Sequence, residues 1–223
     1  IGILLNYSSS KIMETSPAKP IKNSFKNKYR MKNEKKIKNT LRVGVIGCGS
    51  FAIKNILPHF SKFNADLVAV LNSTDKSFAK IETLYSPKLL THSIDDFFEA
   101  NLDAVIISSR HDSHSKYVLE CIDRDIPVHV EKPLCLNMNQ LDEIKKRALR
   151  KKSLVTIGFN RRTAEVITMI KDELSKHKAP MQINYRINAP LLPSTHWSLD
   201  KELGGGRLIG EGCHFIDLTN YIS

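Results

Sequence analysis

Short apolar segments alternate with helical ones between residues 41 and 158, and this alternation restricts the fold more than any other feature. Five runs are rich in β-branched or other apolar residues, as buried parallel strands are. These predicted strands are Leu41–Gly47, Asp66–Leu71, Asp103–Ile107, Pro127–Val130 and Leu154–Gly158. Strands that alternate with helices at this spacing form right-handed βαβ units and a parallel sheet covered on both faces. The sequence therefore predicts an α/β fold with a doubly wound parallel sheet.

The segments between these strands have helical periodicity. Pro58 lies in the first of them and predicts a kink or an early end there, because proline has no backbone N–H and clashes with the preceding turn. The predicted helices cover about 53–60, 76–84, 94–99, 114–124, 138–151 and 163–175.

Beyond the last of these helices the pattern changes. Gln182–Asn188 alternates polar and apolar residues, which predicts a strand with one solvated face that belongs to a different sheet. A lone strand is not stable without about two further strands or a packing partner. We therefore expect a dinucleotide-binding domain over residues 41–160 and an incomplete α+β substrate domain over 161–223.

A glycine-rich turn follows the first predicted strand and opens the first predicted helix. Its residues read GxGxxA: Gly47, Cys48, Gly49, Ser50, Phe51 and Ala52. The first glycine permits a tight turn, the second lets the backbone approach a pyrophosphate, and the alanine permits close packing of helix on strand. In this strand–turn–helix context the motif predicts a Rossmann domain that binds a dinucleotide.

The end of the second strand leaves the choice between NAD and NADP open. Rossmann domains often place an acidic residue there that binds the ribose 2′-hydroxyl. This chain has Asn72 at that place, followed by Ser73, Thr74 and Lys76. An asparagine can bind a ribose hydroxyl but does not repel a 2′-phosphate, and the segment can equally be a plain loop. We expect NAD or NADP as the cofactor.

The net charge of +11 is concentrated at one end of the chain. Residues 1–40 contain ten lysines and arginines, two acidic residues and few large apolar ones, which predicts a basic disordered linker. We expect no specific nucleic-acid partner. No apolar run approaches the ~20 residues of a membrane span. The four cysteines have no metal-ligand spacing, so we expect no metal site and a reducing, cytoplasmic location.

Three motifs in the same order resemble the Gfo/Idh/MocA family of oxidoreductases, named for glucose–fructose oxidoreductase and inositol dehydrogenase. They are the GxGxxA turn, the VHVEKP segment at 128–133 and the GGGRLIGEGCHFIDL segment at 204–218. The segments SRHDSH at 109–114, GFNRR at 158–162 and His196-Trp197 resemble a branch of two-part proteins. In that branch a zinc-type alcohol dehydrogenase module precedes the family's domain. On this interpretation the chain is a fragment, Ile1–Tyr7 is the last strand of the preceding module, and the full-length protein is a homo-oligomer.

The resemblance implies roles for particular residues. Lys132 corresponds to a lysine that binds the reacting hydroxyl and the cofactor ribose, and His214 to the acid/base that takes the hydroxyl proton. These types suit the chemistry, because histidine titrates near neutral pH and an ammonium stabilises a developing alkoxide. Further cofactor contacts are expected from Ser109, His114 and Glu131. The substrate contacts that we expect are Asn160, Arg161, His196 and Trp197.

One position departs from the family pattern. An aspartate usually lies four residues before the histidine, and this chain has Gly210 there. Glu211 shares a helix face with His214 at a spacing of three residues and can replace that carboxylate. Asp217 either orients the imidazole or has a structural role.

We therefore expect an NAD(P)-dependent dehydrogenase that acts on the CH–OH group of a sugar, polyol or nucleotide-linked sugar. Two alternatives stay open. The chain can be a catalytically impaired dinucleotide-binding regulator, which the missing aspartate favours, or an inactive fragment of such an enzyme. The retained Lys132 and His214 favour the enzyme.

Overall fold

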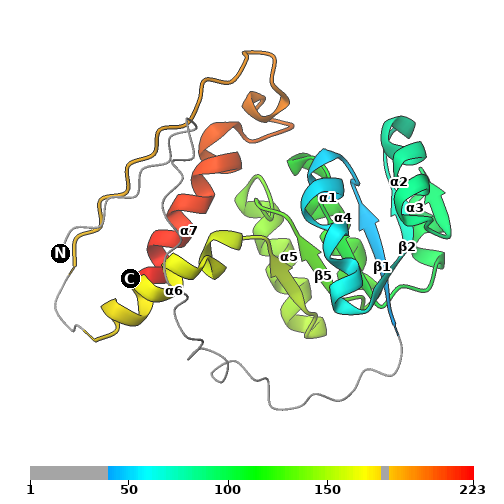
Figure 1. Cartoon of the computed structure of the whole chain (residues 1–223), viewed down its shortest axis with the longest axis horizontal. Helices are drawn as coiled ribbons and strands as arrows, with labels where there is room; N and C mark the ends of the chain where they lie inside the picture. The colour runs from blue at the N-terminus through cyan, green and yellow to red at the C-terminus, as the bar shows by residue number, and fades with distance from the viewer. Residues whose placement is uncertain (1–39, 177–180) are drawn as a thin grey trace, which may run out of the picture. The chain divides into compact units, whose positions relative to one another are not determined.

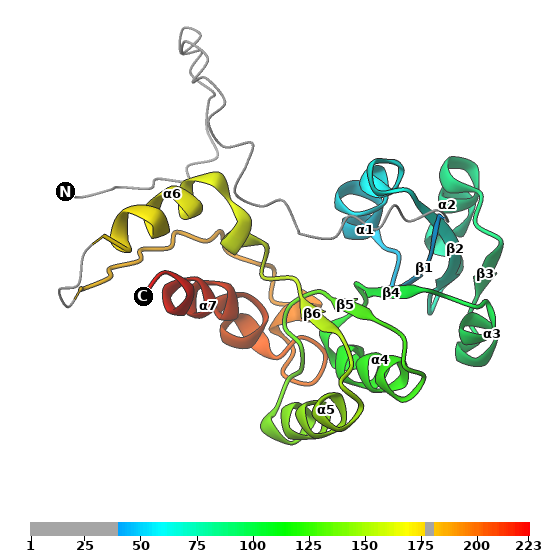
Figure 2. The same cartoon turned by 90° about the horizontal axis from the view of Figure 1, so that it is seen from below.

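The computed structural model describes residues 40–176 and 181–223 (Figure 1), and their core is a six-stranded parallel sheet in the order β3-β2-β1-β4-β5-β6 (Figure 2). The α/β prediction and all five predicted strands are confirmed. The sixth strand, β3, was not predicted, because three residues are too few to produce a recognisable pattern. The strands are β1 (Leu41–Ile46), β2 (Ala65–Leu71), β3 (Leu89–Thr91), β4 (Ala104–Ile107), β5 (Val128–Val130) and β6 (Val155–Ile157).

The helices follow the predicted segments closely. The first ends early, as Pro58 predicts, and a 3-10 helix follows it. The fourth begins at His111, three residues before the predicted start. The α-helices are α1 (Ser50–Asn55), α2 (Phe78–Tyr85), α3 (Ile94–Glu99), α4 (His111–Asp123), α5 (Met138–Lys151), α6 (Glu165–Leu174) and α7 (Cys213–Ile222). The 3-10 helices are η1 (Leu57–Phe63), η2 (Asp75–Ser77), η3 (Asn160–Thr163) and η4 (Trp197–Leu199), and η5 (Leu208–Gly212) is a π-helical turn.

Helices cover both faces of the sheet, and each face has its own apolar core (Figure 2). Successive residues of a strand point to opposite faces, so Val45 packs with α1, η1 and α2, whereas Ile46 packs with α3, α4 and α5. Because all six strands are parallel, their carboxyl ends lie on one edge of the sheet. That edge is where ligands bind in open α/β sheets.

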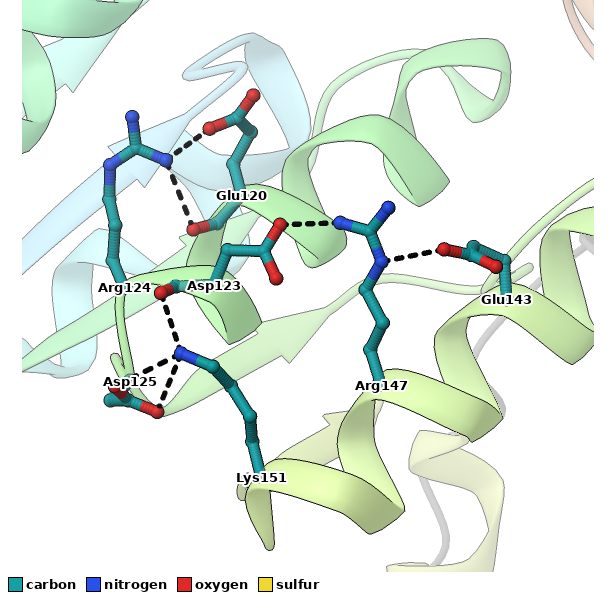
Figure 3. Close-up of polar contacts among 7 residues, drawn as sticks. All are labelled: Glu120, Asp123, Arg124, Asp125, Glu143, Arg147 and Lys151. Carbon is teal, nitrogen blue, oxygen red and sulfur yellow. Dashed lines mark hydrogen bonds and ion pairs between the residues drawn. The ribbon is translucent and has the colours of Figure 1, made fainter.

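The helices α4 and α5 are joined at their solvent side by ion pairs (Figure 3). Arg147 pairs with Asp123 of α4 and with Glu143, and Lys151 donates to the Asp123 carbonyl at 2.7 Å. These groups are partly exposed to solvent, which screens their charges, so the pairs contribute little to stability. Apolar packing of Ile144 on Cys121 and Ile122 holds the helices together.

The helices α6 and α7 lie side by side in both views (Figures 1 and 2). Arg162, just before α6, forms a two-pronged ion pair with Asp217 of α7. Lys171 donates to the Tyr221 carbonyl at 2.6 Å, and its ammonium lies 3.5 Å from the centre of the Tyr221 ring. These contacts set the direction of α7, which carries His214.

Three expectations have different outcomes. The strand predicted over Gln182–Asn188 is wrong, because no segment of the described residues pairs with it and a strand needs a partner for its backbone hydrogen bonds. The basic linker and the strand at Ile1–Tyr7 lie almost entirely outside the described residues. The boundary near residue 160 stays a prediction.

None of the helices in residues 40–176 and 181–223 combines the length and the apolar character that crossing a membrane requires.

Gly47 ends β1 and has no room for a side chain. Its φ is +81°, and a Cβ there would lie 2.3 Å from the Cα and backbone N of Ser109, which follows β4. We expect Gly47→Ala to lower the free energy of unfolding by about 2–5 kcal/mol, because a left-handed conformation and overpacking add. Urea unfolding measures this loss. Gly206→Ala is the matched control. The φ of Gly206 is +73°, but a Cβ built there meets no atom within 4 Å, so only the conformational cost of about 1–2 kcal/mol remains. Equal losses would contradict the proposed contact with Ser109.

Candidate dinucleotide and proton-transfer site

The glycine-rich turn lies between β1 and α1 at the carboxyl edge of the sheet. Gly47 forms the tight turn with a φ of +81°, and its N–H donates to the Leu71 carbonyl of β2 at 2.8 Å. Gly49 is exposed, and a Cβ built on it meets no atom within 4 Å. The two glycines thus differ: the first is required by the protein itself, whereas the second leaves open space beside the backbone. That space fits the approach of a pyrophosphate.

Asn72 does not face outward as a ribose ligand would. Its Oδ1 accepts from the Cys48 N–H at 2.7 Å, and its Nδ2 donates to the Ser77 Oγ at 2.8 Å. The Ser77 hydroxyl donates in turn to the Cys48 carbonyl at 2.8 Å. The Asn72 side chain thus bonds to the protein itself through both its oxygen and its nitrogen, and its contact with the ribose stays a prediction.

His114 is fully buried and contacts backbone rather than open space. Its Nδ1 lies 2.7 Å from the Pro133 carbonyl and its Nε2 3.0 Å from the Ser109 carbonyl. Burial lowers the pKa of His114, although both carbonyls act in the opposite direction. The ring joins the loop after β4 to the loop after β5. Both ring nitrogens of His114 thus have partners within the protein, and its cofactor contact stays a prediction. Ser109 lies at the turn beside Gly47.

Glu131 and Lys132 follow β5 and lie beside different elements. A Cβ on Gly158 would lie 2.9 Å from the Glu131 Oε2, so Glu131 packs against the end of β6. Burial raises the pKa of Glu131, and Lys132 partly offsets this. The Lys132 ammonium donates to the Gly210 carbonyl at 2.8 Å. This bond links the carboxyl end of β5 to the π-helical turn η5, directly before α7.

His214 lies in the first turn of α7, close to positive charge. Its pKa is lowered to about 4, first by burial and then by the charges of Lys132 and Arg161, whereas Asp217 and Glu211 oppose the shift. Its Nδ1 is buried without a hydrogen-bond partner in the described part of the chain. The Phe159 ring lies 6.2 Å away, edge to face. His214 is therefore a neutral imidazole at pH 7, able to accept a proton.

The two carboxylates expected near His214 bind arginines instead. Both Nε and Nη2 of Arg207 donate to Glu211 Oε2, at 3.0 and 2.6 Å. Asp217 is held by Arg162, which agrees with a structural role. A side chain at Gly210 would be crowded, since a Cβ would lie 3.1 Å from both the Gly204 carbonyl oxygen and the His111 ring. Glu211 thus bonds to Arg207 and does not replace the missing aspartate by a direct bond to His214.

The four expected substrate contacts fall in two places. Asn160 and Arg161 begin η3, where Asn160 is exposed and the Arg161 guanidinium lies 4.9 Å from the centre of the Phe215 ring. Trp197 packs edge to face on His111 at 4.7 Å, and its neighbour His196 stacks on it at 5.9 Å. The tryptophan therefore has packing partners in the protein.

His111 was missed as an important residue. It is buried at the start of α4, its Nδ1 lies 2.8 Å from the Gly204 carbonyl, and burial lowers its pKa to about 4. The only signal in the sequence was its position after the third predicted strand. Its contact with Gly204 connects two segments 93 residues apart, which no local pattern reveals.

The cysteine side chains are no candidates for nucleophiles. All four cysteines are free, and burial raises the pKa of Cys48 and of Cys121 to about 12, so these thiols are unreactive. In the parts of the chain that the structure describes, no three histidine, cysteine or acidic side chains are grouped as metal ligands.

A six-stranded parallel sheet with a GxGxxA turn at its central strand defines a dinucleotide-binding Rossmann protein. Residues 41–159 match the family model GFO_IDH_MocA, described as "Oxidoreductase family, NAD-binding Rossmann fold". The chain therefore belongs to the Gfo/Idh/MocA oxidoreductase family, and its cofactor is NAD or NADP.

Known proteins similar to this chain include an inositol 2-dehydrogenase from Saccharopolyspora erythraea. It is 27% identical over 195 residues, which cover 82% of this chain and 54% of the relative. The chain spans just over half the length of the first curated relatives that it matches.

Two solved structures share the fold. The WlbA dehydrogenase from Bordetella pertussis, in complex with NADH and UDP-GlcNAcA, has a TM-score of 0.71 at 17% identity and covers 83% of this chain and 56% of its own. A variant of a 3-ketoreductase from Actinomadura kijaniata, in complex with TDP-benzene and NADP, has a TM-score of 0.65 at 19% identity and covers 77% and 54%.

The open space at Gly49 makes a clean test of dinucleotide binding. We expect Gly49→Val to abolish NADH and NADPH binding, because the valine side chain fills the space that the pyrophosphate needs. The melting temperature should stay close to wild type, since the φ of −89° is ordinary and no protein atom is displaced. Nicotinamide fluorescence titration measures binding. Equal affinity of the variant and the wild type would disprove the position of the pyrophosphate.

The titration of His214 tests its surroundings. We expect its imidazole to titrate near pH 4 in an NMR experiment, because burial and two nearby cations disfavour the charged form. In Lys132→Met the pKa should rise toward 6.5, since one cation is removed. The spectrum of His214→Gln assigns the resonance. A wild-type pKa near 6.5, or no change in Lys132→Met, would contradict this arrangement.

Proposed function

We propose that this chain forms the dinucleotide-binding and proton-transfer part of a dehydrogenase that acts on the CH–OH group of a sugar, polyol or nucleotide-linked sugar. One observation carries the proposal. The Lys132 ammonium and the neutral His214 imidazole are brought together at the carboxyl edge of the sheet, through the bond of Lys132 to the Gly210 carbonyl.

These two side chains divide the work on the alcohol. A bound nicotinamide dinucleotide supplies the acceptor for the hydride that leaves the carbon. His214 accepts the hydroxyl proton, which its low pKa permits at neutral pH. The Lys132 ammonium stabilises the negative charge that develops on the oxygen. In the reverse direction the same histidine returns the proton to the alcohol.

The low pKa of His214 has a consequence for the reaction. An imidazole with a pKa of about 4 is available as a base at neutral pH but is a weak one. The nearby ammonium offsets this weakness, because it lowers the pKa of the alcohol whose proton is removed. The orphaned Nδ1 supports a site that is completed by a ligand, since leaving a buried nitrogen unpaired costs about 1–3 kcal/mol.

The substrate class rests on the similar proteins. They include an inositol dehydrogenase and a dehydrogenase in complex with UDP-GlcNAcA. Asn160 and Arg161 stay proposed substrate contacts, as do His196 and Trp197 despite the packing of the tryptophan. The homo-oligomer, the two-part architecture and a cytoplasmic location, which suits four free thiols, remain predictions.

Replacing the two proposed catalytic groups tests the function. In the full-length protein, with NAD or NADP and either myo-inositol or a UDP-sugar, we expect Lys132→Met and His214→Ala each to lower kcat by roughly 100-fold or more. Exposed His59 provides the control, and His59→Ala should retain wild-type kcat. Melting temperatures check that the variants are folded.

Two results would contradict the proposal. Normal turnover by both variants would remove Lys132 and His214 from the chemistry. Tight dinucleotide binding by the wild-type protein without turnover of any sugar alcohol would favour the alternative, a dinucleotide-binding regulator. The observation that favours the regulator is the bond of Glu211 to Arg207, which leaves His214 without this carboxylate as a direct partner.

A further inference from the structure

A closed set of three hydrogen bonds holds Cys48, the residue between the two glycines of the turn. Its N–H donates to Asn72 Oδ1 at 2.7 Å, and its carbonyl accepts from the Ser77 hydroxyl at 2.8 Å. Asn72 and Ser77 are themselves joined at 2.8 Å. Both backbone groups of Cys48 are thereby fixed from the end of β2 and from η2. We call Cys48, Asn72 and Ser77 the turn clamp.

The turn clamp occupies the side chain that would otherwise select the cofactor. A Rossmann domain that is specific for NAD commonly has a carboxylate at this place, which binds the ribose 2′-hydroxyl and repels a 2′-phosphate. Asn72 is neutral, and its oxygen is already bonded to Cys48. Asn72 therefore cannot repel a 2′-phosphate by charge, and its oxygen already holds the Cys48 N–H.

The other charged groups at the end of β2 do not restore a negative charge. Asp75 is the nearest carboxylate along the chain, and its Oδ1 lies 2.8 Å from His92 Nε2. His92 Nδ1 lies 2.6 Å from the Asn72 carbonyl oxygen, so both ring nitrogens face acceptors. The two ring nitrogens can donate at the same time only in the imidazolium form. The hydrogen bonds to the Asn72 carbonyl and to Asp75 therefore raise the pKa of His92. Lys76 is exposed and adds a positive charge.

From this arrangement we infer that Asn72 is a positioning residue for the glycine turn and that the chain binds NADPH at least as tightly as NADH. This inference rests on the dinucleotide-dependent function proposed above. It goes beyond that function because it explains which cofactors bind. Asn72 is neutral and belongs to the turn clamp, and the carboxylate of Asp75 is paired with His92, so neither repels a 2′-phosphate as a free carboxylate would.

Two substitutions of Asn72 separate its two effects. Asn72→Asp keeps an oxygen that accepts from the Cys48 N–H, adds a negative charge and loses the Nδ2 donor to Ser77, a loss that Ser77→Ala controls for. We expect it to weaken NADPH binding on the order of tenfold more than NADH binding, since a carboxylate and a 2′-phosphate repel even when partly screened. Asn72→Ala removes the clamp, and we expect it to weaken both dinucleotides by a similar factor of about tenfold.

The measurement is the Kd of NADH and of NADPH for the whole chain, by fluorescence titration without substrate. Ser77→Ala removes the other arm of the turn clamp and should weaken both cofactors without changing their ratio. Thr83→Ala, which removes an exposed hydroxyl of α2, is the control and should change neither Kd. Melting temperatures establish that each variant is folded.

The outcomes are distinct from those of the turnover experiment. Wild-type protein that binds NADH more than tenfold more tightly than NADPH would overturn the inference and leave the role of Lys132 and His214 untouched. Unchanged Kd values in Asn72→Ala would overturn the positioning role. An equal effect of Asn72→Asp on both cofactors would overturn the charge argument. Loss of turnover in the Lys132 and His214 variants has no bearing on these ratios.

Discussion

The parallel pairing of β1 with β2 on one side and with β4 on the other is the constraint on which the rest of the structure depends. The strand order reverses at β1, so the chain leaves β1 and β4 toward opposite faces of the sheet. Where the two chain segments start to diverge they touch, and Gly47 leaves no space for a Cβ beside Ser109. This contact of two strand ends positions the glycine turn and the loop after β4, which leads into α4 and His114.

The second determinant is the placement of charge around His214. Lys132 reaches the helix through a backbone carbonyl, not through a carboxylate, so its positive charge is not neutralised by that partner. Glu211 and Asp217 are each occupied by an arginine. Positive charge therefore outweighs negative charge near the imidazole, and with burial this keeps His214 neutral. A carboxylate bonded to the ring would have the opposite effect and favour the imidazolium.

Several polar residues expected to bind ligands also have partners within the protein. Asn72 fixes the glycine turn, His114 joins two loops and Trp197 packs on His111. The physical reason is the same for Asn72 and His114. Loops at the carboxyl edge of a sheet carry many backbone groups that lack sheet partners, and buried ones must be satisfied by side chains. A polar side chain in such a loop is thus as often needed by the backbone as by a ligand.

The sequence by itself determined the sheet, the helices that cover it and the glycine turn, because apolar periodicity and the two special glycines act over a few residues. It also predicted Lys132 and His214 as the catalytic pair, through motifs that resemble those of the family, and this stays a proposal. It failed for β3, which is too short to have a pattern, and for Gln182–Asn188, whose alternation has no partner strand in the described residues. Only the tertiary structure decided that Lys132 bonds to Gly210, 78 residues away, that Asn72 faces the turn and that Glu211 faces Arg207. These choices depend on which groups meet across the folded chain, and the spacing of residues along the sequence carries no information about that.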